Sequence, residues 1–220
     1  MDWKKTITAC IDQADKEQLF YYAQQSLNKT LRYVQMNIWG DDHQLRRWRA
    51  ITALGWLSEA FAQEKDEEFR NLLRRCLWAM NDESGNVPWA APEVMAAIIK
   101  GRPQQYAEFI PMLITNGLDN TMCHKGVAWA VGYLLPEHEA RLAPFWEKIC
   151  ALLTSKDSEV RGFAAAALFK SGRLDIQEQL KGMTQDAGEC YYYQNGRLDK
   201  MTVGQLAGGL AEASGEMTTA

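Results

Sequence analysis

Glu93 is the side chain in this sequence with the clearest potential for chemistry. It follows Trp89 and Pro92 near the start of an apolar stretch whose spacing predicts a short helix. A carboxylate near a helix N-terminus is stabilised by the helix dipole, so its position can be explained without a ligand. If it instead faces a groove, it could orient a polar or cationic group of a partner.

An internal register places Glu93 in one column with residues of three other predicted helices. When these helices are superposed from their equivalent starting positions, the column of Glu93 contains Thr52, Trp129 and Ala166. A column of this kind lies on one face of a repeat array, and the concave surfaces of such arrays bind partners. The sequence therefore predicts a concave groove lined by Trp89, Glu93 and Trp129, with simple packing as the alternative.

Four arginines form a second candidate set: Arg49, Arg74, Arg75 and Arg161. The planar guanidinium matches carboxylate and phosphate geometry, so these side chains could bind an anion or an acidic peptide. The alternative is a structural ladder between adjacent repeats, with Asp82, Glu83 and Asp157 as acidic partners. We favour the ladder because long charged side chains usually lie on solvated faces. Arg49 and Arg161 are retained as candidate partner-binding residues.

The sequence predicts no metal site and no cofactor. The pair Cys123-His124 lacks the CxxC or HxxxH spacing of a strong metal site, and there is no glycine-rich phosphate loop or nucleophile elbow. The five cysteines are odd in number and scattered, which favours reduced thiols that act as small core residues.

Pairs of amphipathic helices recur along the chain. In the central pair, an apolar stripe over 69–80 is followed by the polar turn 81–86 and a second helix over 89–99. Other helices are predicted over 3–14, 17–37, 44–62, 106–114, 124–135, 139–153 and 158–170. We expect Pro111 and Pro144 to lie inside first helices, where proline causes a kink. The recurrence near 40 residues is typical of an all-α solenoid, an α-α superhelix.

The C-terminal part departs from the repeat. One more helix is expected over 175–182, and Asn195-Gly196 between the runs 190–194 and 197–201 predicts a β-hairpin. Thr202 is the expected N-cap of a closing helix over 203–213. We therefore expect one domain over 1–220: a cap helix (1–16), about four helix pairs (17–172), a hairpin-plus-helix cap (173–213) and a tail (214–220).

Composition narrows the classes of partner. The 220 residues carry a formal net charge of −4, which counts against a nucleic-acid surface, and no apolar run is long enough to span a membrane. The N-terminus has no apolar signal segment, so we expect a cytoplasmic protein. Among the eight tryptophans, Trp56 and Trp78 lie off the apolar stripes and are expected to be exposed or to touch a neighbouring repeat. Oligomeric state stays open.

The residues over 144–168 resemble a HEAT repeat, including the phycobilin-lyase-like branch of that superfamily. The resemblance rests on Pro144, the Lys-Asp-Ser turn at 156–158, Val160-Arg161 and the alanine-rich helix. The stretches 48–50, 81–85 and 89–93 are similar to a bacterial branch of HEAT-like proteins, and the resemblance covers most of 17–172. It implies a helical array that serves mostly as a scaffold.

The same superfamily has three enzymatic branches whose characteristic residues can be sought in this sequence. The di-iron hydroxylases carry several His-Glu pairs, whereas this chain has only His138-Glu139. The alkylpurine DNA glycosylases use a basic concave face, which the acidic balance counts against. Bilin lyases act with partners, and no residue carries their function over to this chain.

The sequence thus predicts a non-catalytic scaffold that binds a protein or peptide on its concave face. The alternative is a small-ligand-handling protein of the bilin-lyase type, or a HEAT-like base-excision enzyme, with Glu93 as the acid or base. A deep apolar pocket with Glu93 at its floor would favour a small ligand. A broad, shallow groove would favour a protein partner.

Overall fold

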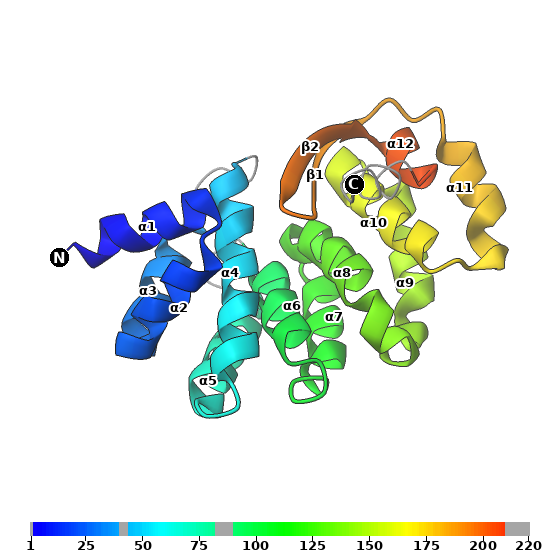
Figure 1. Cartoon of the computed structure of the whole chain (residues 1–220). Helices are drawn as coiled ribbons and strands as arrows, with labels where there is room; N and C mark the ends of the chain where they lie inside the picture. Colours follow the sequence, from blue (N-terminus) through cyan, green and yellow to red (C-terminus); the bar gives the residue numbers. More distant parts are fainter. Residues whose placement is uncertain (1, 40–43, 82–89, 210–220) are drawn as a thin grey trace. The chain divides into compact units, whose positions relative to one another are not determined.

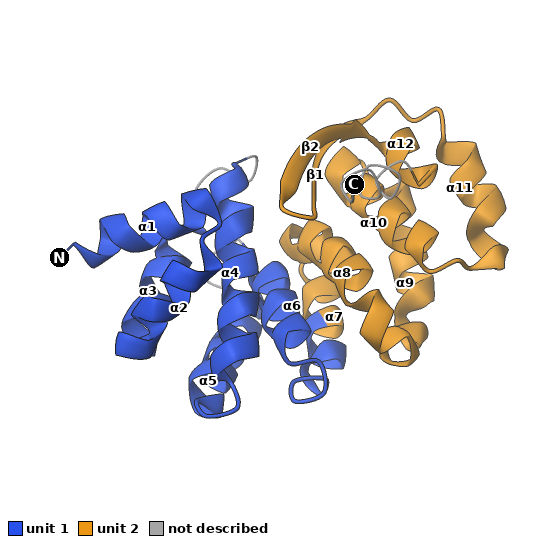
Figure 2. Cartoon of the chain, in the orientation of Figure 1, with its two compact units in different colours: residues 1–113 blue, residues 114–220 orange. Residues whose placement is uncertain are grey.

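The computed structural model describes residues 2–39, 44–81 and 90–209 (Figure 1). These residues are mostly helical, with a small antiparallel two-stranded sheet near the C-terminal end. The chain divides into two compact units, Met1–Leu113 and Ile114–Ala220 (Figure 2). No helix in the described ranges combines the length and the apolar character that a membrane crossing needs.

Unit 1 begins with three short helices, α1 (Trp3–Gln13), α2 (Lys16–Gln25) and α3 (Leu27–Met36). The Asp2 carboxylate caps α1, and the Asp15 carboxylate caps α2 by accepting from the Gln18 N–H at 2.9 Å. The prediction of one helix over 17–37 is wrong, because Ser26 adopts an extended backbone (φ −162°, ψ 96°) between α2 and α3. Serine favours helix starts over helix interiors, and the break lets the two helices pack on each other.

The core of unit 1 is the contact of α4 (Leu45–Phe61) with α6 (Ala91–Gly101), and α5 (Asp66–Met80) packs beside α6. Glycines allow the two backbones to approach closely. A Cβ added at Gly55 would lie 2.8 Å from the Ala97 carbonyl oxygen, and one added at Gly101 would overlap the Gly55 carbonyl oxygen. The Ser58 hydroxyl donates to the Ile98 carbonyl at 2.9 Å across the same contact.

The prediction of a kink at Pro111 is wrong. Helix α7 (Phe109–Asp119), which contains the boundary between the units, begins only two residues before Pro111. Proline is tolerated in a first turn because its missing N–H has no intrahelical acceptor there. The irregular helix is instead α8 (His124–Leu142), which contains Pro136 and has non-helical backbone angles at His138 (φ −135°, ψ 24°).

The helix predicted over 139–153 is broken into short pieces. After α8, Ala143–Phe145 forms a 3-10 turn that contains Pro144, followed by α9 (Trp146–Ala151) and a second 3-10 turn at Leu152–Thr154. Pro144 thus lies near the start of a 3-10 turn and not inside an α-helix, and its fixed φ and missing N–H favour such a position.

Unit 2 is centred on the packing of α8 against α10 (Ser158–Lys170). A Cβ added at Gly132 of α8 would lie 3.3 Å from the Cα and Cβ atoms of Ala167, so this contact is close but less tight than the one between α4 and α6. The helix expected over 175–182 appears as a 3-10 turn at Leu174–Ile176 followed by α11 (Gln177–Met183).

The predicted hairpin is confirmed. Strands β1 (Glu189–Gln194) and β2 (Arg197–Thr202) pair antiparallel, from Glu189 opposite Thr202 to Gln194 opposite Arg197. Asn195 (φ 51°) and Gly196 (φ 77°) supply the two positive φ angles of a type I′ turn.

The Thr202 N-cap is also confirmed, as part of a capping box with Gln205 at the start of α12 (Val203–Ala207). This helix is shorter than predicted, because it ends at Ala207 before Gly208 and Gly209. The predicted tail over 214–220 lies outside the described residues.

Candidate functional site

Two of the three residues of the predicted groove, Glu93 and Trp129, are buried. Trp89 lies outside the described residues. Glu93 lies in the first turn of α6 in unit 1 and is 3% exposed, whereas Trp129 lies on α8 in unit 2 and is 4% exposed. The Trp129 indole N–H donates to the Tyr193 carbonyl at 3.1 Å, and its ring stacks on Tyr133. Trp129 therefore anchors the hairpin to α8, and neither it nor Glu93 presents a side chain at the surface.

Arg49 and Arg161 link elements of the fold. Arg49 donates from α4 to the Asp12 carbonyl at the end of α1. Arg161 donates to both carboxylate oxygens of Asp186, at 2.9 and 3.2 Å, and to the carbonyls of Ser155 and Lys156.

These contacts are of the structural kind that the ladder interpretation predicts, but the acidic partners differ. Asp157, one of the candidate acidic partners, caps α10 by accepting from the Glu159 N–H, and the carboxylate that Arg161 binds is that of Asp186. Asp82 and Glu83 lie outside the described residues. The hydrogen bonds from Arg161 hold the pKa of the Asp186 carboxyl below its usual range, although burial opposes this shift.

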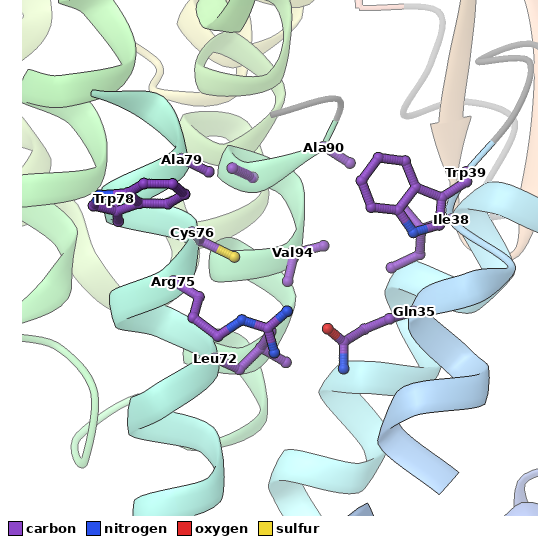
Figure 3. Close-up of a pocket in the computed structure, with 11 residues that line it drawn as sticks. Gln35, Ile38, Trp39, Leu72, Arg75, Cys76, Trp78, Ala79, Ala90 and Val94 are labelled. Atoms are coloured by element: carbon purple, nitrogen blue, oxygen red, sulfur yellow. The ribbon is translucent and has the colours of Figure 1, made fainter. Parts of the chain in front are cut away.

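A pocket of about 360 Å³ lies within unit 1, at the C-terminal end of α3 and beside α5 and α6 (Figure 3). Its walls are mainly apolar side chains, contributed by Ile38, Leu72, Ala79, Ala90, Ala91 and Val94. The apolar stripe of α5 and the buried start of α6 supply most of them. The small alanines fill less of the space between the elements than larger side chains would, which leaves room for a cavity.

Two tryptophans that line this pocket are unusually exposed. Trp39 follows α3 and is 68% exposed, and Trp78 lies on α5 and is 69% exposed. Burying aromatic side chains of this size contributes strongly to stability, so leaving two beside one apolar pocket is a feature that binding surfaces often have. Trp56, the other tryptophan expected to lie off the stripes, is half-buried.

Among the described residues that line the pocket, the charged one is Arg75. On the same helix, Arg70 pairs with Asp66 and Glu108, and Arg74 pairs with Glu67 at 2.7 Å. Arg75 makes no ion pair or hydrogen bond with any residue that the structure describes. Among the described residues, therefore, no side chain competes with a ligand for its guanidinium.

Gln35 faces Arg75 from the other side of the pocket (Figure 3). Its amide nitrogen donates to the Leu31 carbonyl at 3.0 Å. Within the described ranges its carbonyl oxygen, Oε1, has no hydrogen-bond donor. The pocket thus offers a charged donor and a neutral acceptor on opposite walls.

Cys76 forms part of the pocket wall but is not set up for reaction. Burial raises the pKa of its thiol to about 12, the charge of Arg75 opposes this shift, and the charge of Glu93 adds to it. A thiol with this pKa stays protonated at neutral pH, so it is a poor nucleophile. Glu93 does not line the pocket, and in the described part of the chain no cluster of three or more His, Cys, Asp or Glu side chains could hold a metal ion.

A second pocket, of about 430 Å³, lies in unit 2 around Phe169, Arg173 and Lys181. Both of its cations already have partners, because Arg173 pairs with Asp175 and Lys181 with Glu178. The pocket of unit 1 is therefore the better candidate for binding a charged group.

Sequence reasoning found this site only in part. Arg75 belongs to the predicted arginine set, and the off-stripe position of Trp78 indicated exposure. Nothing in the local pattern separated Trp39 and Gln35 from other residues near the end of a helix, because their place in the pocket depends on residues of α5 and α6 that are distant in the sequence. Searches against protein-family models, curated proteins and solved structures found no match to this chain.

Proposed function

We propose that this protein is a non-catalytic, HEAT-like helical-repeat scaffold that binds a segment of a partner protein at the unit 1 pocket. The observation that carries the proposal is the combination of Trp39, Trp78 and Arg75 around one apolar cavity. Tryptophan and arginine dominate the energetically important positions of protein interfaces. This site differs from the concave groove that the sequence predicts around Trp89, Glu93 and Trp129, where Glu93 and Trp129 are buried.

The repeat pattern supports the scaffold part of the proposal. The register that aligns Thr52 with Trp129 also aligns Gly55 with Gly132. Gly55 of α4 closely contacts α6, and Gly132 of α8 closely contacts α10, so each glycine contacts the second α-helix after its own. An equivalent packing position in both units is what stacked helix pairs require. The superhelix itself is part of the proposal.

The size of the pocket favours the binding of one or two side chains of a partner segment over the binding of a large ligand. Sites for small molecules usually measure roughly 300–1,000 Å³, and this pocket is at the lower end of that range. It can accept one or two large side chains, while the exposed tryptophans extend the contact outside the cavity. The small-ligand alternative relies on Glu93 as acid or base, and Glu93 does not line this pocket.

The net charge of −4 and the presence of one cation among the described lining residues favour a protein segment over nucleic acid. The five cysteines are all free, which supports the proposed cytoplasmic location because thiols stay reduced there.

A random peptide library displayed on phage tests the proposal. It is selected on the wild-type chain, and the enriched peptides are then measured against a Trp39→Ala/Trp78→Ala variant and against a control, Met122→Ala/Leu174→Ala. The control removes two exposed apolar side chains of unit 2. We expect at least about a tenfold loss of affinity in the tryptophan variant alone, equivalent to about 1.4 kcal/mol.

Methyl NMR locates the binding surface, since the peptide should shift the signals of Ile38, Leu72 and Val94. Circular dichroism confirms that each variant is folded. The proposal fails if no peptide is enriched, or if the enriched peptides bind both double variants equally well.

A further inference from the structure

We infer that the segment recognised at the unit 1 pocket carries an aspartate or glutamate next to a large apolar residue, and that Arg75 binds its carboxylate. This inference rests on the proposed function, and it specifies the chemistry of the partner.

The charge of the pocket is the first argument. Arg75 is exposed and is the charged residue among the described residues that line the cavity. The other two arginines of α5 are neutralised by carboxylates, at Asp66, Glu108 and Glu67. An arginine without an internal partner, at the margin of an apolar site, is best matched by a carboxylate, which the guanidinium can bind through two parallel hydrogen bonds.

Spacing along α5 is the second argument. Leu72, Arg75 and Trp78 follow one another at intervals of three residues, so they lie along one side of the helix. The carboxylate-binding group is therefore flanked by an apolar wall and by an exposed aromatic ring. A partner that fills the pocket with a large apolar side chain places its neighbouring residues next to Arg75.

Gln35 is the third argument. Its Oε1 atom accepts no hydrogen bond from the described residues and lies across the pocket from Arg75 (Figure 3). A carboxylate cannot occupy that position favourably, because both groups are acceptors. A peptide N–H can. The pocket thus suits a segment that offers an N–H on one side and a carboxylate on the other.

The nearby carboxylate of Glu93 does not remove this preference. Its charge acts on Cys76, but Glu93 is buried, and it does not line the pocket. No ion pair joins Arg75 to any carboxylate in the described ranges, so none of these carboxylates neutralises its charge by direct contact.

Charge exchange tests the inference. The same random library is selected separately on the wild-type chain, on Arg75→Glu and on Arg74→Glu. Arg74 is the matched control, because it is the adjacent exposed arginine of α5 and already pairs with Glu67. We expect acidic residues beside the apolar anchor in peptides from the wild type and from Arg74→Glu, and basic residues in peptides from Arg75→Glu.

The enriched wild-type peptide is then synthesised with its acidic residue as Glu, Gln or Lys. We expect the Gln form to bind the wild type about tenfold more weakly than the Glu form, and the Lys form to bind Arg75→Glu best. The difference between the Glu and Gln forms should shrink in 1 M salt, where screening acts within about 3 Å.

The outcomes separate this inference from the proposed function. Peptides that need Trp39 and Trp78 but show no charge preference, or a basic one, overturn the inference and leave the scaffold proposal in place. Failure to enrich any peptide overturns both. Light scattering adds one more decisive outcome: concentration-dependent dimers that the Trp78→Ala variant lacks would make a second copy of the chain the occupant, against the inference.

Discussion

Arg161 in unit 2 and Arg75 in unit 1 lie on helices of the same fold, but the chain uses them differently. Arg161 donates to a carboxylate and two backbone carbonyls, and its side chain is 19% exposed. Arg75 has no such contact among the described residues. Arg161 is a structural link because the fold supplies a carboxylate, whereas none of the described residues supplies one to Arg75.

The C-terminal segment explains the difference. Asp186, between α11 and β1, binds Arg161 and also accepts from the Gly188 N–H at 2.8 Å. The same segment continues into the hairpin, whose Tyr193 carbonyl accepts from Trp129. Unit 2 is thus covered by residues that follow its last long helix. The pocket in unit 1 has no equivalent cover in the described parts of the chain.

The largest predicted difference between the two units is in stability, at the contact of α4 with α6 and the contact of α8 with α10. We expect Gly101→Ala to destabilise the protein by about 3 kcal/mol or more, because the new methyl group would overlap backbone atoms of Gly55 and Glu59. Gly132→Ala should stay within about 1 kcal/mol of the wild type, since the gain in helix propensity offsets a contact at 3.3 Å. Urea denaturation followed by circular dichroism measures both values. Equal losses would show that the two contacts are equally tight.

The two arginines give the next largest difference. Arg161→Met removes charge-assisted hydrogen bonds and leaves Asp186 half-buried without its partner, so we expect a loss of about 2–3 kcal/mol. Arg75→Met should change the stability by less than about 0.5 kcal/mol, because it breaks no contact with the described residues. The measurement is again urea denaturation. A large loss in Arg75→Met would mean that Arg75 is structural, and the comparison would fail.

Elements defined by local chemistry could be predicted from the sequence. The Asn195-Gly196 turn needs two positive φ angles, the Thr202 cap needs a hydroxyl, and the start and end of α10 match the expected 158–170. Each depends on residues within a few positions of one another, which is the range over which sequence patterns are informative.

Features that depend on packing could not be predicted. The break at Ser26 and the position of Pro111 in a first turn depend on where neighbouring helices begin. The apolar pattern around Glu93 gave no indication that its side chain would be buried while Trp39 and Trp78 stayed exposed. Which face of a helix is covered depends on elements distant in the sequence, and a single sequence does not specify them.

A change of pH gives the smallest expected effect on the free energy of unfolding. It tests whether the Arg161–Asp186 pair holds the C-terminal segment against unit 2, because protonation of Asp186 leaves the packing unchanged. Hydrogen bonds from Arg161 lower the pKa of Asp186 in the folded state, with burial opposing this and the Gly188 N–H adding to it. For a carboxyl whose pKa is lower when folded, the contribution to stability is fully present above the unfolded pKa of about 3.9. The contribution is lost as the pH falls through the lower, folded pKa.

We therefore expect the free energy of unfolding to decrease below about pH 4, and to decrease less in Asp186→Asn, which cannot titrate there. Asp66 in unit 1 serves as the matched case. Burial acts to raise its pKa, but hydrogen bonds from Arg70, Gln105 and Tyr106 outweigh this and the pKa is lowered, so Asp66→Asn should also reduce the acid dependence. Urea denaturation at pH 3, 4, 5 and 7 provides the values. If Asp186→Asn keeps the full acid dependence while Asp66→Asn reduces it, the Arg161–Asp186 link does not close unit 2 and the contrast with Arg75 no longer holds.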